Sequence, residues 1–95
     1  MSDASRVTVQ LPRVLAQVTG GARHFEVPAG TLRQVLDGLI EQQPGLGYHL
    51  FDEAGAMRRH ILCFCNEEYR RGRDGLDVPV RAGDRVTILN SVSGG

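Results

Sequence analysis

A chain of 95 residues has room for one domain with one hydrophobic core. Its 11 basic residues balance its 11 acidic residues, which argues against a nucleic-acid-binding module, because such a module needs a basic surface to neutralise phosphates. No apolar run approaches the roughly 20 residues that cross a membrane, and the N-terminus lacks the apolar core of a secretory signal, so we expect a cytoplasmic protein that binds neither nucleic acid nor membrane.

The N-terminal third of the chain predicts two strands. Residues 7–11 alternate apolar and polar side chains, and residues 24–27 do so again. Pro12 ends the first segment, and a loop through Gly20 and Gly21 leads to the second. We expect an antiparallel hairpin with a long connection.

Residues 31–43 give the clearest helix signal. Thr31 can cap the helix, and Gln34 three residues later completes a capping box. Pro44 and Gly45 end the helix. Apolar side chains recur at helical spacing and predict one continuous stripe that faces a sheet, formed by Leu32, Val35, Leu36, Leu39 and Ile40.

The segment after the helix is expected to be irregular over residues 46–56. Tyr48, Leu50 and Phe51 are expected to pack this segment onto the core as a short turn. Residues 60–66 then predict a strand that is apolar on both faces, which is typical of a central strand.

The central strand carries two different sets of side chains. Ile61, Cys63 and Cys65 alternate with Leu62 and Phe64, and a single helix can cover only one of the two faces. We expect the cysteines to be core residues rather than a disulfide or a metal site. Residues i and i+2 of a strand are too far apart for an unstrained disulfide, and no further ligand lies at zinc-finger spacing.

The C-terminal part predicts one short segment and one strand. Residues 67–75 are charged and turn-like, and residues 76–80 are edge-like, because Pro79 cannot donate to a ladder. Residues 85–89 are the last strand, which must lie beside the first or the central one. The element order indicates an α+β fold, a mixed sheet covered on one face by one main helix. We expect residues 1–89 to form this domain and residues 90–95 to form a flexible tail that ends in Gly-Gly.

Two segments together resemble the MoaD/ThiS family of sulfur-carrier proteins. They are A-G-D-R-V-T-I-L at residues 82–89 and the terminal Ser93-Gly94-Gly95. The resemblance covers nearly the whole chain and implies the ubiquitin-like β-grasp fold. Leu-Pro at 11–12, Thr-Gly-Gly at 19–21 and Asn-Glu-Glu at 66–68 look most like the actinobacterial branch, which serves cysteine biosynthesis.

The resemblance implies a carrier rather than an enzyme. An ATP-dependent activating enzyme of the ubiquitin-activating type would adenylate the C-terminal carboxylate of Gly95, and sulfur would then convert it to a thiocarboxylate. Val92, Ser93 and Gly94 would thread the tail into the partners' active sites. The protein itself would supply no catalytic side chain, bound metal or cofactor. The second partner would be a sulfur-accepting enzyme, either cysteine synthase-like or the large subunit of molybdopterin synthase.

We expect Leu62 and Phe64 to form part of an apolar patch near the tail that docks both partners. Alternatively, residues 46–57 cover these two side chains. The arginines at 58–59 and at 70, 71 and 73 are either a solvated face or a docking surface for an acidic partner.

Four other functions remain open from the sequence. They are the small subunit of a molybdopterin synthase, a sulfur carrier for the thiamine thiazole, a ubiquitin-like modifier joined to other proteins through Gly95, and an interaction module with a passive tail. The chain has no lysine, which excludes self-linked chains but leaves single attachments possible.

Overall fold

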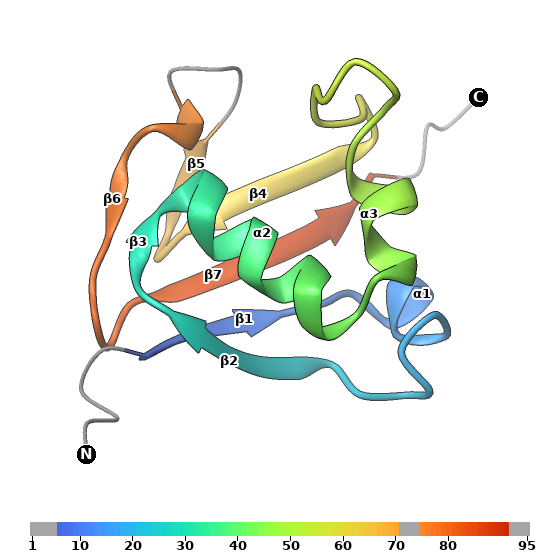
Figure 1. Ribbon diagram of the computed structural model, residues 1–95, viewed down its shortest axis with the longest axis horizontal. Helices are drawn as coiled ribbons and strands as arrows, with labels where there is room; N and C mark the ends of the chain where they lie inside the picture. The colour runs from blue at the N-terminus through green and yellow to red at the C-terminus, as the bar shows by residue number, and fades with distance from the viewer. Residues whose placement is uncertain (1–5, 71–74, 92–95) are drawn as a thin grey trace.

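The computed structural model describes residues 6–70 and 75–91, which form one mixed sheet with a helical layer on one face (Figure 1). The five strands are, in spatial order, β2 (His24–Pro28), β1 (Arg6–Gln10), β7 (Arg85–Asn90), β4 (Ile61–Cys65) and β5 (Glu68–Arg70). The pair β1 and β7 is parallel, and the other neighbours are antiparallel. The last strand thus lies between the first and the predicted central strand, and pairs with both.

The main helix, α2 (Leu32–Gln42), begins and ends as the sequence predicts. Thr31 Oγ1 accepts from the backbone N–H of Gln34 at 3.1 Å, and the Gln34 side chain accepts from the backbone N–H of Thr31 at 2.9 Å. This reciprocal capping box satisfies two donors that a helix start leaves unpaired. Four members of the predicted apolar stripe are fully buried, and Ile40 is partly buried against the same core.

Four smaller elements complete the described fold. Two are the short helices α1 (Arg13–Ala16) and α3 (Gly45–Leu50), and the other two are the strands β3 (Gly30–Thr31) and β6 (Pro79–Val80), which form a separate two-stranded sheet. The short helix α1 lies within the long connection of the predicted hairpin.

Two local predictions are wrong. Residues 45–50 are helical rather than irregular, and the side chain of Tyr48 is 75% exposed, although Leu50 and Phe51 are buried as expected. Part of the predicted turn at residues 67–75 is strand β5, which pairs with β4 from Cys65↔Glu68 to Cys63↔Arg70.

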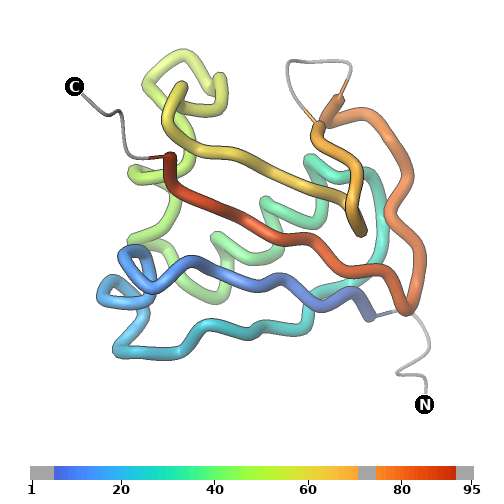
Figure 2. The backbone as a smooth tube through the Cα atoms, turned by 180° about the vertical axis from the view of Figure 1, so that it is seen from behind, coloured from blue at the N-terminus to red at the C-terminus, as the bar shows by residue number. Residues whose placement is uncertain are grey.

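The two faces of β4 are occupied as its alternation predicts. Ile61, Cys63 and Cys65 are buried on the α2 side, whereas Leu62 and Phe64 are half-buried on the opposite side. The predicted register of this strand is confirmed. Figure 2 shows the face that α2 leaves uncovered, which we call the outer face, in front of the helical layer.

The predicted β-grasp architecture is confirmed by the order of the five strands and by α2 lying across one face. The sheet continues to Asn90, and the backbone N–H of Ser91 donates to the carbonyl of His60 at 2.7 Å. In the part of the chain that the structure describes, no helix is long and apolar enough to cross a membrane. The cytoplasmic location stays a prediction.

Candidate functional site

Four apolar side chains meet on the outer face where β7, β4 and β5 lie side by side. Leu62 is paired with Leu89, and Phe64 is paired with Tyr69. The ring centroids of Phe64 and Tyr69 are 5.4 Å apart at a tilt of 44°. Leu89 is 42% exposed and Tyr69 is 47% exposed. We call these four residues the outer patch. Contiguous exposed apolar side chains of this kind mark interaction surfaces.

A tight turn places β5 so that it completes the outer patch. Asn66 and Glu67 connect β4 to β5, and Asn66 adopts a φ of 60°. Asparagine accepts this left-handed conformation more readily than most residues. Its side-chain Oδ1 accepts from the backbone N–H of Arg85 at 3.1 Å, and its own backbone N–H donates to the carbonyl of Arg85 at 2.7 Å. These bonds tie the turn to the start of β7.

One end of the outer patch, formed by Leu62 and Leu89, lies at the end of β7 from which the chain continues toward its C-terminus, whereas Phe64 and Tyr69 lie toward the other end of β4. Leu89 is followed by Asn90 and Ser91, the last residue that the structure describes. The predicted modification site at Gly95 and the predicted threading residues Val92, Ser93 and Gly94 lie outside the described residues. At full extension, the four residues at positions 92–95 can reach at most about 14 Å beyond Ser91.

The structure brings together the two predicted patch residues and adds two more. Leu62 and Phe64 lie on the outer face, while residues 45–57 pack on the helix side and leave this face open (Figures 1 and 2). The sequence prediction missed Leu89 and Tyr69. Asn66 in a two-residue turn was the signal that could have revealed β5 and, with it, the position of Tyr69. The docking role of the patch stays a prediction.

A polar hollow of about 430 Å³ lies beside the patch on the outer face. Its lining includes Gln10, His24, Asp84 and Arg85. Side chains of both charge signs line it, and they include no serine or cysteine nucleophile. Among the residues that the structure describes, no group of three His, Cys, Asp or Glu side chains could hold a metal ion.

The two cysteines are buried thiols, as predicted. Removal from water, and then the neighbouring Cys65, raise the pKa of Cys63 to about 12. Burial, followed by the negative charge of Asp84, also raises the pKa of Cys65. Because the thiolate is the reactive form, both groups are poor nucleophiles at neutral pH.

Comparison with known proteins covers almost the entire chain. The model of the ThiS family matches residues 9–95. The chain is 34% identical over 91 residues to the sulfur carrier protein CysO of Mycobacterium tuberculosis, covering 94% of this chain and 98% of that protein.

Solved structures agree with this assignment. A chain in the crystal structure of the BexX/CysO complex of Amycolatopsis orientalis is 34% identical and has a TM-score of 0.83, covering 94% of this chain and 99% of that chain. SAMP1 from Haloferax volcanii is 29% identical with a TM-score of 0.82, covering 95% and 99%. Urm1 from Trypanosoma brucei, at 22% identity and a TM-score of 0.66 over 100% of both chains, shares the fold. The ubiquitin-like β-grasp classification is confirmed.

Proposed function

The chain belongs to the ThiS family of sulfur carriers, and on this premise we propose that it carries sulfur as a thiocarboxylate on Gly95 for cysteine biosynthesis. It is a carrier protein rather than an enzyme. The activating chemistry therefore belongs to a partner, and this chain contributes its C-terminal carboxylate and the surfaces that present it.

The proposed chemistry follows from the poor reactivity of a carboxylate, whose leaving group would be oxide. A carboxylate oxygen of Gly95 attacks the α-phosphorus of ATP in the partner's active site, and pyrophosphate leaves. Sulfide (HS⁻) from the sulfur donor then attacks the acyl carbon, AMP leaves, and the thioacid loses its proton. The resulting thiocarboxylate is anionic at neutral pH, and its polarisable sulfur is a good nucleophile toward the acceptor.

Two features support the terminus as the working part. The ThiS family model matches the chain up to Gly95. Glycine at positions 94 and 95 places no Cβ in the path of a narrow active-site channel, and it allows bends with positive φ.

We propose that the outer patch docks both the adenylating enzyme and the enzyme that accepts the sulfur. The observation that carries this proposal is that Leu89 of the patch lies two residues before Ser91, beyond which the tail continues. A partner that covers Leu62, Phe64 and Leu89 therefore sits within reach of the terminal carboxylate. The existence of a BexX/CysO complex supports docking of a related carrier to a partner protein.

Cysteine biosynthesis is the proposed pathway because the curated relatives are named CysO and match almost full length. The acceptor is then a cysteine synthase-like enzyme, rather than the large subunit of a molybdopterin synthase or a thiazole-forming enzyme.

Intact mass spectrometry tests the carrier step. After incubation with the adenylating enzyme, ATP and sulfide, the chain should become heavier by the difference between a sulfur and an oxygen atom. An unchanged mass would contradict the proposal.

The match to SAMP1 favours a second candidate function, because related chains with this fold are named small archaeal modifier proteins. In that case Gly95 would form an amide bond to a lysine of another protein. An epitope-tagged chain should then appear in higher-mass bands that resist boiling and reduction, and deletion of Gly95 should remove them. The carrier function predicts a single band.

A further inference from the structure

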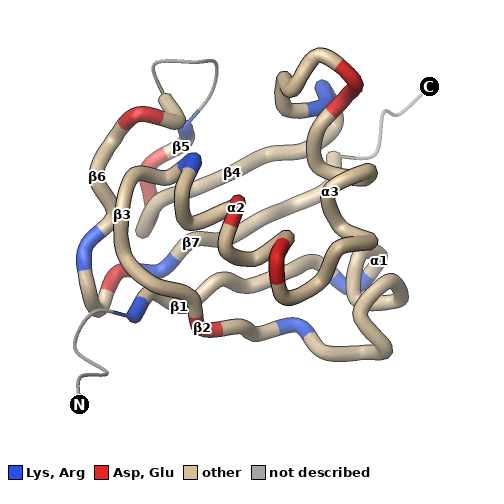
Figure 3. The backbone as a smooth tube through the Cα atoms, viewed as in Figure 1, with Lys and Arg blue, Asp and Glu red and all other residues tan. Residues whose placement is uncertain are grey.

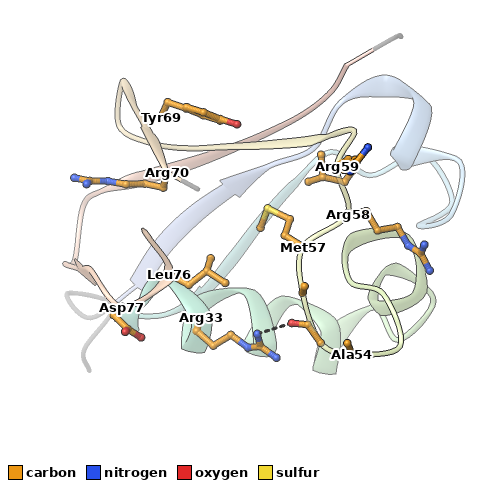
Figure 4. A pocket seen from close by; sticks show the side chains of 12 residues that line it. Arg33, Ala54, Met57, Arg58, Arg59, Tyr69, Arg70, Leu76 and Asp77 are labelled. Atoms are coloured by element: carbon orange, nitrogen blue, oxygen red, sulfur yellow. Dashed lines mark hydrogen bonds between the residues drawn. The ribbon is translucent and has the colours of Figure 1, made fainter. Parts of the chain in front are cut away.

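A second hollow lies on the helix side of the sheet, at the edge formed by β4 and β5 (Figure 4). Its volume is about 560 Å³, which is within the usual range for ligand-binding pockets. Met57 and Leu76 point toward one another across it in Figure 4, and Ile61 adds to its lining. The centre of this cavity is therefore apolar.

The rim of the cavity is cationic. Four of its lining residues are arginines, and Asp77 is the one acidic residue among those identified in its lining. The whole chain, by contrast, has 11 basic and 11 acidic residues. The charges are thus unevenly distributed, and Figure 3 shows where the basic residues of the described ranges lie along the backbone. The arginines of the rim are Arg33, Arg58, Arg59 and Arg70.

Two of these arginines have no carboxylate partner among the residues that the structure describes, so their positive charge is not neutralised by a neighbour. Arg58 is held by neutral groups, since its Nε donates to the carbonyl of Tyr48 at 2.8 Å and its guanidinium lies 5.2 Å from the centre of the Tyr48 ring. Arg59 is exposed and makes no hydrogen bond or ion pair with any residue that the structure describes. The other two differ, because Arg33 lies 3.6 Å from Asp37 and Arg70 pairs with Glu68.

The guanidinium groups do not converge on one point. In Figure 4 the side chains of Arg58 and Arg70 extend away from the centre in different directions, and Arg33 is bonded to the carbonyl of Gly55 at 3.0 Å. A small anion such as phosphate would find no cluster of donors at the centre. An extended ligand with an apolar group in the middle and negative charges on its flanks fits this arrangement.

We propose that this cavity, which we call the rim-cationic cavity, is a second docking surface that binds an acidic segment of a partner protein. One apolar side chain of the segment fills the space between Met57 and Leu76. Flanking carboxylates pair with Arg58 and Arg59, since the planar guanidinium matches carboxylate geometry. Arg58 is already positioned by Tyr48, which lowers the ordering cost of binding.

The position of the cavity lets it act separately from the outer patch. The cavity opens on the helix side, whereas Leu62, Phe64 and Leu89 lie on the outer face. Tyr69 is the one patch residue that also lines the cavity. Because Leu62, Phe64 and Leu89 lie outside the cavity lining, a partner that binds these three residues leaves most of the cavity free for another partner. This inference does not depend on the chemistry of Gly95.

A peptide titration followed by NMR of the ¹⁵N-labelled chain tests the proposal. The probe is the blocked hexapeptide EDLFDE. It should shift the backbone amides of Gly55, Met57 and Ile61, and should leave those of β1 and β2 in place. Two matched peptides are controls, QNLFNQ without the charges and EDSSDE without the apolar side chains. Each should bind at least about tenfold more weakly than the probe.

Charge-reversal variants locate the binding site. Arg59→Glu should weaken binding of EDLFDE by about tenfold or more, whereas Arg81→Glu, an exposed arginine outside the cavity, should leave it within about twofold. Met57→Gln should also weaken binding while Arg58 and Arg59 remain in place. The proposal is overturned if EDLFDE causes no shifts at the cavity, if it shifts only the outer patch, if either control peptide binds as tightly, or if Arg59→Glu has no effect.

Discussion

Leu62 of β4 and Leu89 of β7 are directly paired across two antiparallel strands, and both side chains lie on the sheet face that α2 leaves uncovered. Directly opposed side chains in an antiparallel pair contact one another. The pair therefore links the apolar outer surface of β4 to the end of β7. A partner that binds this surface is brought next to the C-terminal residues.

Phe64→Ala should weaken binding of the adenylating enzyme and leave the melting temperature nearly unchanged. The side chain is half-buried against Tyr69 on the outer face and is not part of the buried core. Titration calorimetry and thermal unfolding measure the two effects. Val14→Ala is a control, because Val14 is 49% exposed and lies outside both the outer patch and the rim-cationic cavity. A large fall in melting temperature for Phe64→Ala would assign this ring to the core instead.

Leu36→Ala should lower the free energy of unfolding by roughly 2–5 kcal/mol, through lost burial and the cavity left behind. Leu36 is fully buried in the face of α2 that covers the sheet. Urea denaturation gives the value. Val14→Ala, at a side chain that is 49% exposed, should stay within about 0.5 kcal/mol of the parent. A loss below about 1 kcal/mol for Leu36→Ala would mean that α2 is not the main contact of the core.

The stability of the fold should decrease in alkaline solution because of Cys63. Burial, and then Cys65, raise its pKa from 9.0 to about 12. Between these two values the unfolded chain has lost the thiol proton and the folded chain has kept it. The unfolded state therefore binds fewer protons, and the free energy of unfolding falls as the pH rises, by up to about 1.4 kcal/mol per pH unit for this one group.

Urea denaturation at several pH values above 8 measures this dependence. The variant Cys63→Val keeps an apolar side chain of similar size and removes the thiol. Its stability should fall less steeply with pH than that of the parent. Equal slopes for the two proteins would show that Cys63 ionises in the folded state as it does in the unfolded chain.

The sequence was sufficient to predict α2, the first hairpin and the two faces of β4, because their signals are local. Capping residues and side-chain periodicity identify a helix and a strand without knowledge of their neighbours. Helix α3 was missed because it contains two glycines, which disfavour helices. The structure explains Gly47 by close packing, since a Cβ there would lie 3.2 Å from Cγ2 of Ile40. Such a contact exists only once α2 and α3 have packed together.

The outer patch was predicted only in part, because local signals place two of its residues and long-range strand pairing places the other two. Leu62 and Phe64 could be placed on one face from alternation alone. Leu89 and Tyr69 join them only through the pairing of β4 with β7 and β5, which depends on long-range register. The charged sequence Glu68–Arg70 gave no apolar pattern for an edge strand.

The central claim is that Gly95 carries the chemistry through its α-carboxylate, and pyrophosphate exchange with the adenylating enzyme tests it most directly. Three proteins are compared: the parent, a variant lacking Gly95, and a variant with one alanine added after it. The deletion shortens the tail by about 3.3–3.6 Å, and the addition overshoots by the same length and introduces a Cβ. Both variants should fold normally by circular dichroism, and only the parent should support ATP-pyrophosphate exchange. If either variant is adenylated as fast as the parent, the account of Gly95 as the sulfur-carrying residue is contradicted.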